Sequence, residues 1–552
     1  MRSYLAAFKV TALLGLLAGA ALGAMQRSPY WPELSRMALC RGALLGWLAG
    51  TALAIPLGWW LARRAPADDR APRPVWRRGL GAISLVVTLA PVGLWIAAAF
   101  PKSAPHQALA TGRAAKDARP NLILISIDAL RADFLGAYGN RGGLTPALDA
   151  FTREATQYDS AWAYSPWTLT SLGSLFTQLP PSWCGLKQLP DSDEPWYAVY
   201  AALPEDRPLL SERLHGVGYA TGTVLTNVFL QRERGWGRGF DSYWNAMHGP
   251  QETTHAEELT RAVQDWMALN RREPFFLWAH YFDPHKYDAP TTPTEVRAKY
   301  GQWHMRSRKL WEGRMKHEAP RMKARYEEYC RTMYTEEVKY VDHWAGELLA
   351  DLKTSGLWDR SLIVVTADHG EELFDHGDFE HGHSMHREVL RVPLLVKWPK
   401  GVTADRRIPQ TVGLPSLGAT FLQSAGLPAG SGREARPLPR QAGLKGDEVY
   451  SEAMLYGEEQ TALTTDEWRV IYRPFNKSPK ARFEVYDRRK DPLEKTNLAP
   501  AGAVKYLQAR LRRLSEEAQQ EVVARAKREQ GRERRVLTKD AERQLKSLGY
   551  ME

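Results

Sequence analysis

The stretch Asn121–Asp128 (NLILISID) places a carboxylate directly after a short apolar run. A second stretch, Ser361–His369 (SLIVVTADH), repeats the arrangement and ends in Asp368 and His369. Apolar runs of this length are typical of strands buried inside a parallel sheet. Because the sites of open α/β sheets form at the carboxyl ends of strands, the two runs together predict a sheet with a polar site at that edge.

The flanking sequence alternates further strand candidates with helical stretches. A threonine followed by proline, Thr145-Pro146, is typical of a helix start. The other strand candidates are Thr221–Leu225, Phe275–Tyr281 and Val392–Trp398, and the longest helical stretches are Thr254–Asn270 and Arg325–Leu352. Strands that alternate with helices predict an α/β fold, with a central, mostly parallel sheet that is flanked by helices on both faces.

The pattern changes after about residue 446. Short strand candidates follow at Glu448–Glu452, Trp468–Tyr472 and Phe483–Tyr486, and they predict a small antiparallel sheet. Val504–Glu529 then reads as an amphipathic terminal helix of mixed charge. We therefore predict a large domain over residues 120–445 and a C-terminal subdomain with a terminal helix over residues 446–552.

The composition excludes several classes of protein. Of the 552 residues, 44% are hydrophobic and 25% are charged, which is ordinary for a folded chain. Three cysteines are too few for a disulfide scaffold or a multi-cysteine zinc site, and the sequence leaves open whether Cys184 and Cys330 pair. The whole net charge of +11 lies in the first 120 residues. Because the rest is neutral, we expect no nucleic-acid partner.

The first hundred residues predict three membrane helices, over about residues 4–26, 42–62 and 79–100. Val10–Gln26, Gly42–Ala62 and Gly79–Phe100 contain no charged residue, and about 20 residues of helix cross a bilayer. The loop between the second and third spans holds six arginines, so we expect it to be cytoplasmic.

This orientation puts the N-terminus in the cytoplasm. It puts a linker over residues 101–119 and the large domain on the periplasmic or extracellular side of an inner or plasma membrane. Val10–Met25 could instead be a signal peptide that is cleaved after Leu22-Gly23-Ala24, and the large domain would still lie outside.

A divalent metal site is predicted where the second apolar run ends. Asp368 and His369 are a plausible ligand pair, and five of the 14 histidines fall between residues 369 and 386. An imidazole among carboxylate oxygens favours Mn²⁺ or Zn²⁺ over Ca²⁺, which prefers shells made only of oxygen.

The segment Ser165–Leu172 (SPWTLTSL) is the second chemical candidate. A hydroxyl at the first turn of a helix lies at its positive end, and contact with a metal lowers the pKa of an alcohol, so Thr168 could be a nucleophile. It could equally be an N-cap that only stabilises the helix. The residues alone leave both interpretations open.

Together these segments resemble the sulfatase family of the alkaline-phosphatase-like superfamily. The resemblance covers about residues 119–500 in the family's order. It rests on Asp128-x-x-Arg131, on the stretches 139–167 and 274–285, on Asp368–Glu371, on Arg391–Leu394 and on the tail Tyr486-Asp487-x-x-x-Asp491-Pro492. It implies an alkaline-phosphatase-like fold, one catalytic metal ion, and attack by an enzyme nucleophile on the sulfur or phosphorus of an ester.

The resemblance also implies roles for particular residues. Asp128, Asp368 and His369 match the metal ligands of the family. Thr168 matches the nucleophile, which also contacts the metal. His285 matches a histidine that contacts the ester oxygens. Either His381 or His383 lies near the position that neutralises the ester or assists the leaving group.

Three departures keep the function open. Sulfatases read Cys/Ser-x-Pro-Ser-Arg and oxidise the first residue to formylglycine, whereas residues 168–172 read TLTSL. Threonine cannot form formylglycine, Leu172 replaces the arginine, and Ala129 stands where a second aspartate is usual. A threonine nucleophile behind membrane spans is similar to lipoteichoic-acid synthases and phosphoethanolamine transferases.

We therefore favour a membrane-anchored metal-dependent hydrolase of sulfate or phosphate esters. One alternative is a transferase of the phosphoglycerol or phosphoethanolamine type that uses the threonine. The other is a catalytically inactive sulfatase-like binding protein.

Overall fold

The computed structural model describes residues 119–187, 203–245, 255–270, 273–285, 287–300, 318–430 and 432–529. These residues all belong to one compact unit, Pro105–Glu552. The three predicted membrane helices and nearly all of the predicted linker lie outside the described residues. Within those ranges, no helix is long and apolar enough to cross a membrane.

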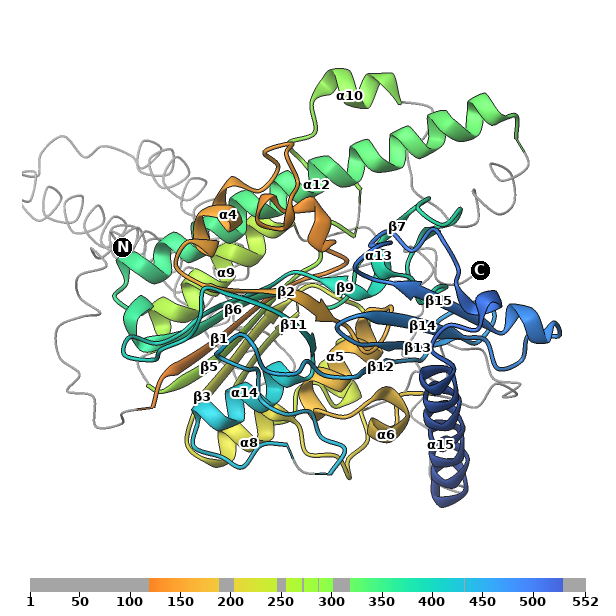
Figure 1. Cartoon of the computed structure of the whole chain (residues 1–552). Coiled ribbons are helices and arrows are strands. Elements are labelled where there is room, and N and C mark those ends of the chain that lie inside the picture. Colours follow the sequence, from red (N-terminus) through yellow and green to blue (C-terminus); the bar gives the residue numbers. More distant parts are fainter. Residues whose placement is uncertain are drawn as a thin grey trace, which may run out of the picture. The chain divides into compact units, whose positions relative to one another are not determined.

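A nine-stranded mixed sheet forms the centre of the described part, with helices on both of its faces (Figure 1). The strand order is β11-β2-β10-β6-β1-β5-β3-β4, and β9 pairs with β2. The strands are β1 (Asn121–Ile127), β2 (Thr156–Trp162), β3 (Ala220–Leu225), β4 (Ser242–Asn245), β5 (Phe275–Tyr281), β6 (Ser361–Ala367), β9 (Arg391–Val392), β10 (Leu394–Lys397) and β11 (Arg407–Gly413).

The three central strands follow directly from their sequences. β1 runs parallel to both β5 and β6, and every residue of the three strands is buried. A strand covered on both faces needs apolar side chains on both, which explains the continuous apolar runs. The predicted parallel core of the sheet is thereby confirmed.

The outer strands differ from the prediction. The candidate Val392–Trp398 is broken at Pro393 into β9 and β10, and β10 runs antiparallel to β6. Proline lacks the N–H that a continuous ladder needs. β2 (TQYDSAW) and β11 (RIPQTVG) were not predicted, because polar residues interrupt both and neither forms an apolar run.

The helices form two layers. Figure 1 shows α4, α9 and α12 on one face of the sheet and α5, α8 and α14 on the other. Their bounds are α4 (Pro146–Thr152), α5 (Thr168–Thr177), α6 (Pro181–Cys184), α8 (Leu210–Gly216), α9 (Ala256–Leu269), α10 (Thr294–Lys299), α12 (Pro320–Thr354), α13 (Arg387–Leu390), α14 (Ser416–Ser424) and α15 (Lys505–Glu529). α9 and α12 confirm the two long helical stretches. Cys184 in α6 and Cys330 in α12 are both buried, and no disulfide joins them.

The C-terminal sheet is antiparallel and has four strands in sequence order, namely β12 (Val449–Ser451), β13 (Thr461–Thr464), β14 (Trp468–Tyr472) and β15 (Phe483–Asp487). Together with α15 it encloses a second small core that includes Leu463, Val470, Val485 and Leu511. This confirms the predicted small sheet, whereas β13 is too short to have stood out in the sequence. The predicted boundary at residue 446 stays a prediction.

Two stacked histidines connect the loop after β6 with the C-terminal part of the chain. The rings of His376 and His386 lie 3.7 Å apart and are nearly parallel, at 5°. Nδ1 of His376 lies 2.5 Å from the Glu388 carboxylate, and Nε2 lies 2.9 Å from the Glu494 carbonyl. Both partners are acceptors, so both ring nitrogens donate. Burial alone would lower the pKa of His376, but the hydrogen bond to Glu388 and the charge of that residue raise it to about 9.

This pairing predicts a stability that depends on pH. The pKa of the folded state lies above the unfolded value of about 6.5, so the stabilisation is complete below that pH and is lost as the pH rises through about 9. We expect a loss of about 1 kcal/mol, limited by partial solvent screening. Denaturant unfolding at pH 6 and pH 10 measures it. His376→Gln should remove this difference in the free energy of unfolding, whereas His343→Gln, a change at an exposed histidine, should keep it. The same difference between pH 6 and pH 10 in all three proteins would contradict the pairing.

Candidate active site

Asp128, Asp368 and His369 meet at the carboxyl ends of β1 and β6, and all three are fully buried. Their ligand atoms lie within 4.8 Å of one another. Nε2 of His369 lies 3.4 Å from Oδ1 of Asp128 and 3.5 Å from Oδ2 of Asp368. The structure thus brings together the three protein ligands that the sequence suggested, and we refer to them as the ligand cluster.

The register of the sheet brings the two aspartates to the same level. Ile127 pairs with Ala367, so Asp128 and Asp368 leave adjacent parallel strands side by side. The backbone N–H groups of Ala129 and His369 donate to Oδ1 of Asp368, at 3.2 and 2.9 Å. One oxygen of Asp368 is therefore held by the backbone, and the other faces His369.

The cluster fits a divalent metal ion. Oδ1 of Asp128 and Oδ2 of Asp368 are buried and have no hydrogen-bond partner. Nδ1 of His369 donates to the Gly370 carbonyl at 2.8 Å, which leaves the Nε2 lone pair facing the carboxylates. Two carboxylate oxygens and one imidazole nitrogen that face a common point are a donor set for a transition-metal ion or zinc.

The electrostatics agree with a cation. Burial and the neighbouring charge of Asp368 raise the pKa of Asp128 well above its usual value. Two buried carboxylates this close destabilise each other unless a positive charge lies between them. The identity of the ion does not follow from the three residues.

Thr168 lies beside the ligand cluster. It is the first residue of α5, and the N-cap position belongs to Trp167, so the capping interpretation of Thr168 is wrong. Its Oγ1 lies 3.2 Å from Nε2 of His369 and 3.5 Å from Oδ2 of Asp128. The buried hydroxyl thus faces the predicted metal position at the positive end of α5.

The structure separates the two histidines that the sequence left as alternatives. The ring of His381 lies 4.4 Å from that of His369, and the ring of His285 lies 4.9 Å from that of His381. Nε2 of His383 instead lies 2.9 Å from the Glu372 carboxylate. His381 therefore lies against the ligand cluster with His285 packed on it, whereas His383 contacts Glu372.

Two residues of the site were not foreseen from the sequence. The side-chain amide of Asn227, just after β3, donates to Oδ2 of Asp128 at 2.9 Å. Nε2 of His280, within β5, lies 3.6 Å from the same oxygen. Burial lowers the pKa of His280 to about 4, so the ring is neutral at pH 7. His280 stands inside the apolar run FFLWAHY, where a histidine reads as part of the core.

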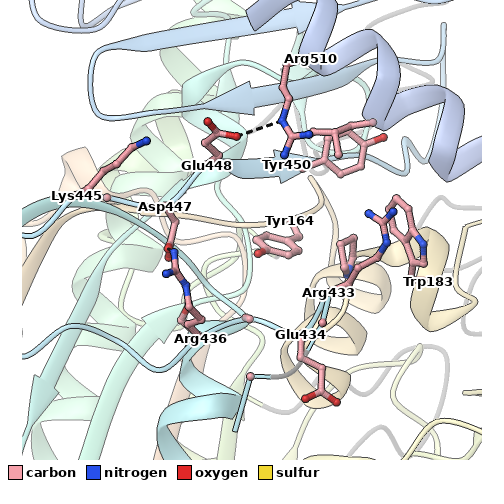
Figure 2. Close-up of a pocket in the computed structure, with 17 residues that line it drawn as sticks. Tyr164, Trp183, Arg433, Glu434, Arg436, Lys445, Asp447, Glu448, Tyr450 and Arg510 are labelled. Carbon is pink, nitrogen blue, oxygen red and sulfur yellow. Dashed lines mark hydrogen bonds and ion pairs between the residues drawn. The ribbon is translucent and has the colours of Figure 1, made fainter.

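A cavity of about 610 Å³ is lined by other residues, which come from the segments around Trp183, Arg433 and Glu448 and from α15 (Figure 2). Tyr164, Trp183 and Tyr450 contribute aromatic rings to its wall. Its charged residues mostly form pairs, such as Arg510 with Glu448 at 3.4 Å. None of the residues that line this cavity belongs to the ligand cluster, and neither Thr168 nor His381 is among them.

Comparison with known proteins decides the family. Residues 120–427, more than half of the chain, match the family model described as Sulfatase. The chain belongs to the sulfatase family. Residues 374–521 of this sulfatase also match the model described as N-sulphoglucosamine sulphohydrolase, C-terminal.

The relatives of this sulfatase have low sequence identity to it, although the similarity extends over most of the chain. It is 24% identical to arylsulfatase K of Gallus gallus over 440 residues, which cover 69% of this chain and 79% of that protein. A solved structure in complex with its substrate D-glucosamine-2-N,6-O-disulfate has a TM-score of 0.55 and 18% identity, over 74% of this chain and 98% of the other. The phosphonate monoester hydrolase of Agrobacterium radiobacter has a TM-score of 0.51 and 16% identity, over 72% and 94%.

The two structural similarities confirm the predicted α/β fold with its central, mostly parallel sheet and small antiparallel C-terminal sheet. Membership of the family makes the chain a sulfatase-family enzyme. Hydrolysis of sulfate esters is the activity that the family supports. The buried cluster of Asp128, Asp368 and His369 agrees with the metal site of such enzymes.

Proposed function

We propose that the chain is a membrane-anchored, metal-dependent hydrolase of sulfate esters in which Thr168 is the nucleophile. The supporting observation is the position of its hydroxyl, 3.2 Å from Nε2 of His369 at the start of α5. No formylglycine is needed for this role, because an alcohol that faces a metal site is activated by its surroundings. We also propose that the catalytic domain lies on the periplasmic or extracellular side of the membrane.

In the first step, Oγ1 of Thr168 attacks the sulfur and forms a covalent ester, while the bond from sulfur to the leaving oxygen breaks. The nearest carboxylate acceptor for the Thr168 proton is Oδ2 of Asp128, 3.5 Å away. When bound, the metal ion stabilises the negative charge on the sulfate oxygens and lowers the pKa of the hydroxyl. The positive end of α5 favours the same charge.

His381 and His285 complete the site on the side of the leaving group. Nδ1 of His381 lies 3.3 Å from Oε2 of Glu371, which orients the ring beside the ligand cluster. In the proposed mechanism His381 protonates the leaving oxygen, and His285, against His381, contacts the ester oxygens. Water then attacks the sulfur and gives a proton to His381 while the bond from sulfur to Oγ1 breaks. Oγ1 takes back its proton from Asp128, so sulfate is released and Thr168 is restored.

The departures from the usual sulfatase motif fit this reduced site. Leu172, at the position of the usual arginine, is fully buried in the core and supplies no charge. Ala129 supplies no second carboxylate, and its backbone N–H contacts Asp368 instead. The proposed site is thus a threonine with three metal ligands.

The substrate class can be tested with matched esters. We expect the full chain to release sulfate from sulfated amino sugars, the class of substrate that is bound in the structural relative. 4-Nitrophenyl sulfate, phosphate and phenylphosphonate separate sulfur from phosphorus, and each assay runs with added Mn²⁺ or Zn²⁺. Release of phosphate products only would contradict a sulfatase activity.

A transferase is the second candidate. The observation that favours it is a threonine at the nucleophile position, next to a site that contains an imidazole. Transfer of a phosphate-linked lipid headgroup to an acceptor alcohol, with no sulfate release, would establish it in place of the hydrolase. Binding of sulfated sugars without any turnover would establish the inactive binding protein.

The proposed membrane anchor predicts a topology. A reporter that is active only outside the cytoplasm should be active when it is fused after Ala110. The same reporter should be silent when it is fused within Ala65–Pro74, because six arginines hold that loop in the cytoplasm. The reverse pattern of activities would overturn the orientation.

A further inference from the structure

We propose that Asn227 and His280 are positioning residues, which hold one oxygen of Asp128 so that only the other is offered to the metal ion. The two oxygens have different surroundings. Oδ2 accepts the Asn227 amide at 2.9 Å, and Nε2 of His280 faces it at 3.6 Å. Oδ1 has no hydrogen-bond partner and lies 3.4 Å from Nε2 of His369.

The orientation of Asn227 is fixed by its other contact. The backbone N–H of Phe229 donates to Oδ1 of Asn227 at 2.9 Å. An amide whose oxygen accepts from the backbone must turn its NH₂ the other way, toward Asp128. Asn227 is 1% exposed, so water does not compete for either contact.

A chain of hydrogen bonds fixes the tautomer of His280. The Trp278 indole, which can only donate, gives its N–H to Oγ of Ser126 at 2.8 Å. The proton of Ser126 is then free for Nδ1 of His280 at 2.9 Å, a better acceptor distance than the 3.4 Å to the Ala279 carbonyl. In the tautomer that these distances favour, Nδ1 of His280 accepts from Ser126 and the ring proton lies on Nε2, facing Asp128.

Asn227 donates a hydrogen bond to Oδ2 of Asp128, whereas His280 faces the same oxygen at 3.6 Å, which is longer than a hydrogen bond. They orient Asp128 without changing the charge of the ligand cluster, so a divalent ion meets two carboxylates and a neutral imidazole. Hydrogen bonds from neighbouring residues to metal ligands set the orientation of those ligands and contribute about 10- to 100-fold to metal affinity. The inference rests on the proposed metal site, but it concerns binding and not turnover.

The test measures metal affinity of the full chain by chelator competition with Mn²⁺ and with Zn²⁺. We expect about 10- to 100-fold weaker binding in Asn227→Leu, which keeps the volume and removes the donor. Thr223→Val is the matched control, because it also removes a buried hydrogen bond near β5, from Oγ1 to the Trp278 carbonyl at 3.0 Å, without contacting Asp128. The control should bind metal like the wild type.

A second pair of variants separates hydrogen bonding from packing. His280→Gln keeps an N–H near Asp128 and should retain most of the affinity, whereas His280→Leu should lose it. Wild-type affinity in folded Asn227→Leu, or equal affinities in both His280 variants, would overturn the inference while leaving the metal site intact. Absence of metal binding in the wild type would overturn the proposed metal site, and this inference with it.

Discussion

Thr168→Ala should abolish turnover of every ester that the wild-type protein hydrolyses. Removal of a catalytic nucleophile costs roughly three to six orders of magnitude in kcat, because the covalent route is lost. The fold should be unaffected, since Thr168 is not the N-cap of α5 and its hydroxyl contacts only site residues in the described structure. Steady-state kinetics and thermal unfolding of the same preparation measure the two effects.

Two variants control this experiment. Thr168→Ser keeps the hydroxyl and should retain activity. Thr170→Ala removes a buried hydroxyl from the same turn of α5, but that hydroxyl bonds Ser165 and the Trp167 carbonyl instead of the ligand cluster. Thr170→Ala should therefore leave the chemical step largely intact. Turnover by Thr168→Ala close to that of the wild type would eliminate the covalent mechanism.

Asp368→Asn should lose both the metal ion and turnover. The substitution removes one of two carboxylates that face Nε2 of His369, so the remaining donors no longer balance a divalent charge. Elemental analysis of protein purified without chelator should find one Mn²⁺ or Zn²⁺ per wild-type chain and almost none in the variant. We expect the loss of activity to reach roughly a thousandfold or more.

The control for this change is Asp359→Asn, which neutralises a largely exposed carboxylate that pairs with Lys400. Its metal content and activity should match the wild type. Metal retained in folded Asp368→Asn, or stoichiometric Ca²⁺ without a transition metal in the wild type, would contradict the assignment of the site.

The central strands and the ligand cluster could be predicted because burial and chemistry leave local marks in the sequence. β1 and β6 are covered on both faces, so each is an apolar run, and each ends in a carboxylate. Parallel pairing then fixes where the carboxylates meet. Asp368 and His369 could be proposed as ligands from the local sequence, whereas the resemblance to the sulfatase family added Asp128 to them.

The remaining features depend on contacts between distant segments. Asn227 acquires a role only because β3 ends near Asp128, 99 positions away in sequence. His280 is hidden in an apolar strand, and only the fold shows that His381 lies against His369 whereas His383 contacts Glu372. β2 and β11 are made strands by their neighbours in the sheet, not by an apolar pattern of their own.

The most direct test of a covalent Thr168 intermediate is intact-mass and peptide mass analysis of the full chain after rapid quenching with a sulfate ester. A covalent sulfate ester on Thr168 predicts an increase of about 80 mass units, which corresponds to one sulfuryl group. The increase should be located on the peptide that contains Thr168 and should be absent from Thr168→Ala. Rapid quenching within a single turnover, with an activated aryl sulfate, favours accumulation of the intermediate. A turning-over enzyme that carries no adduct at any quench time, or one that carries it on a residue other than Thr168, would contradict the account.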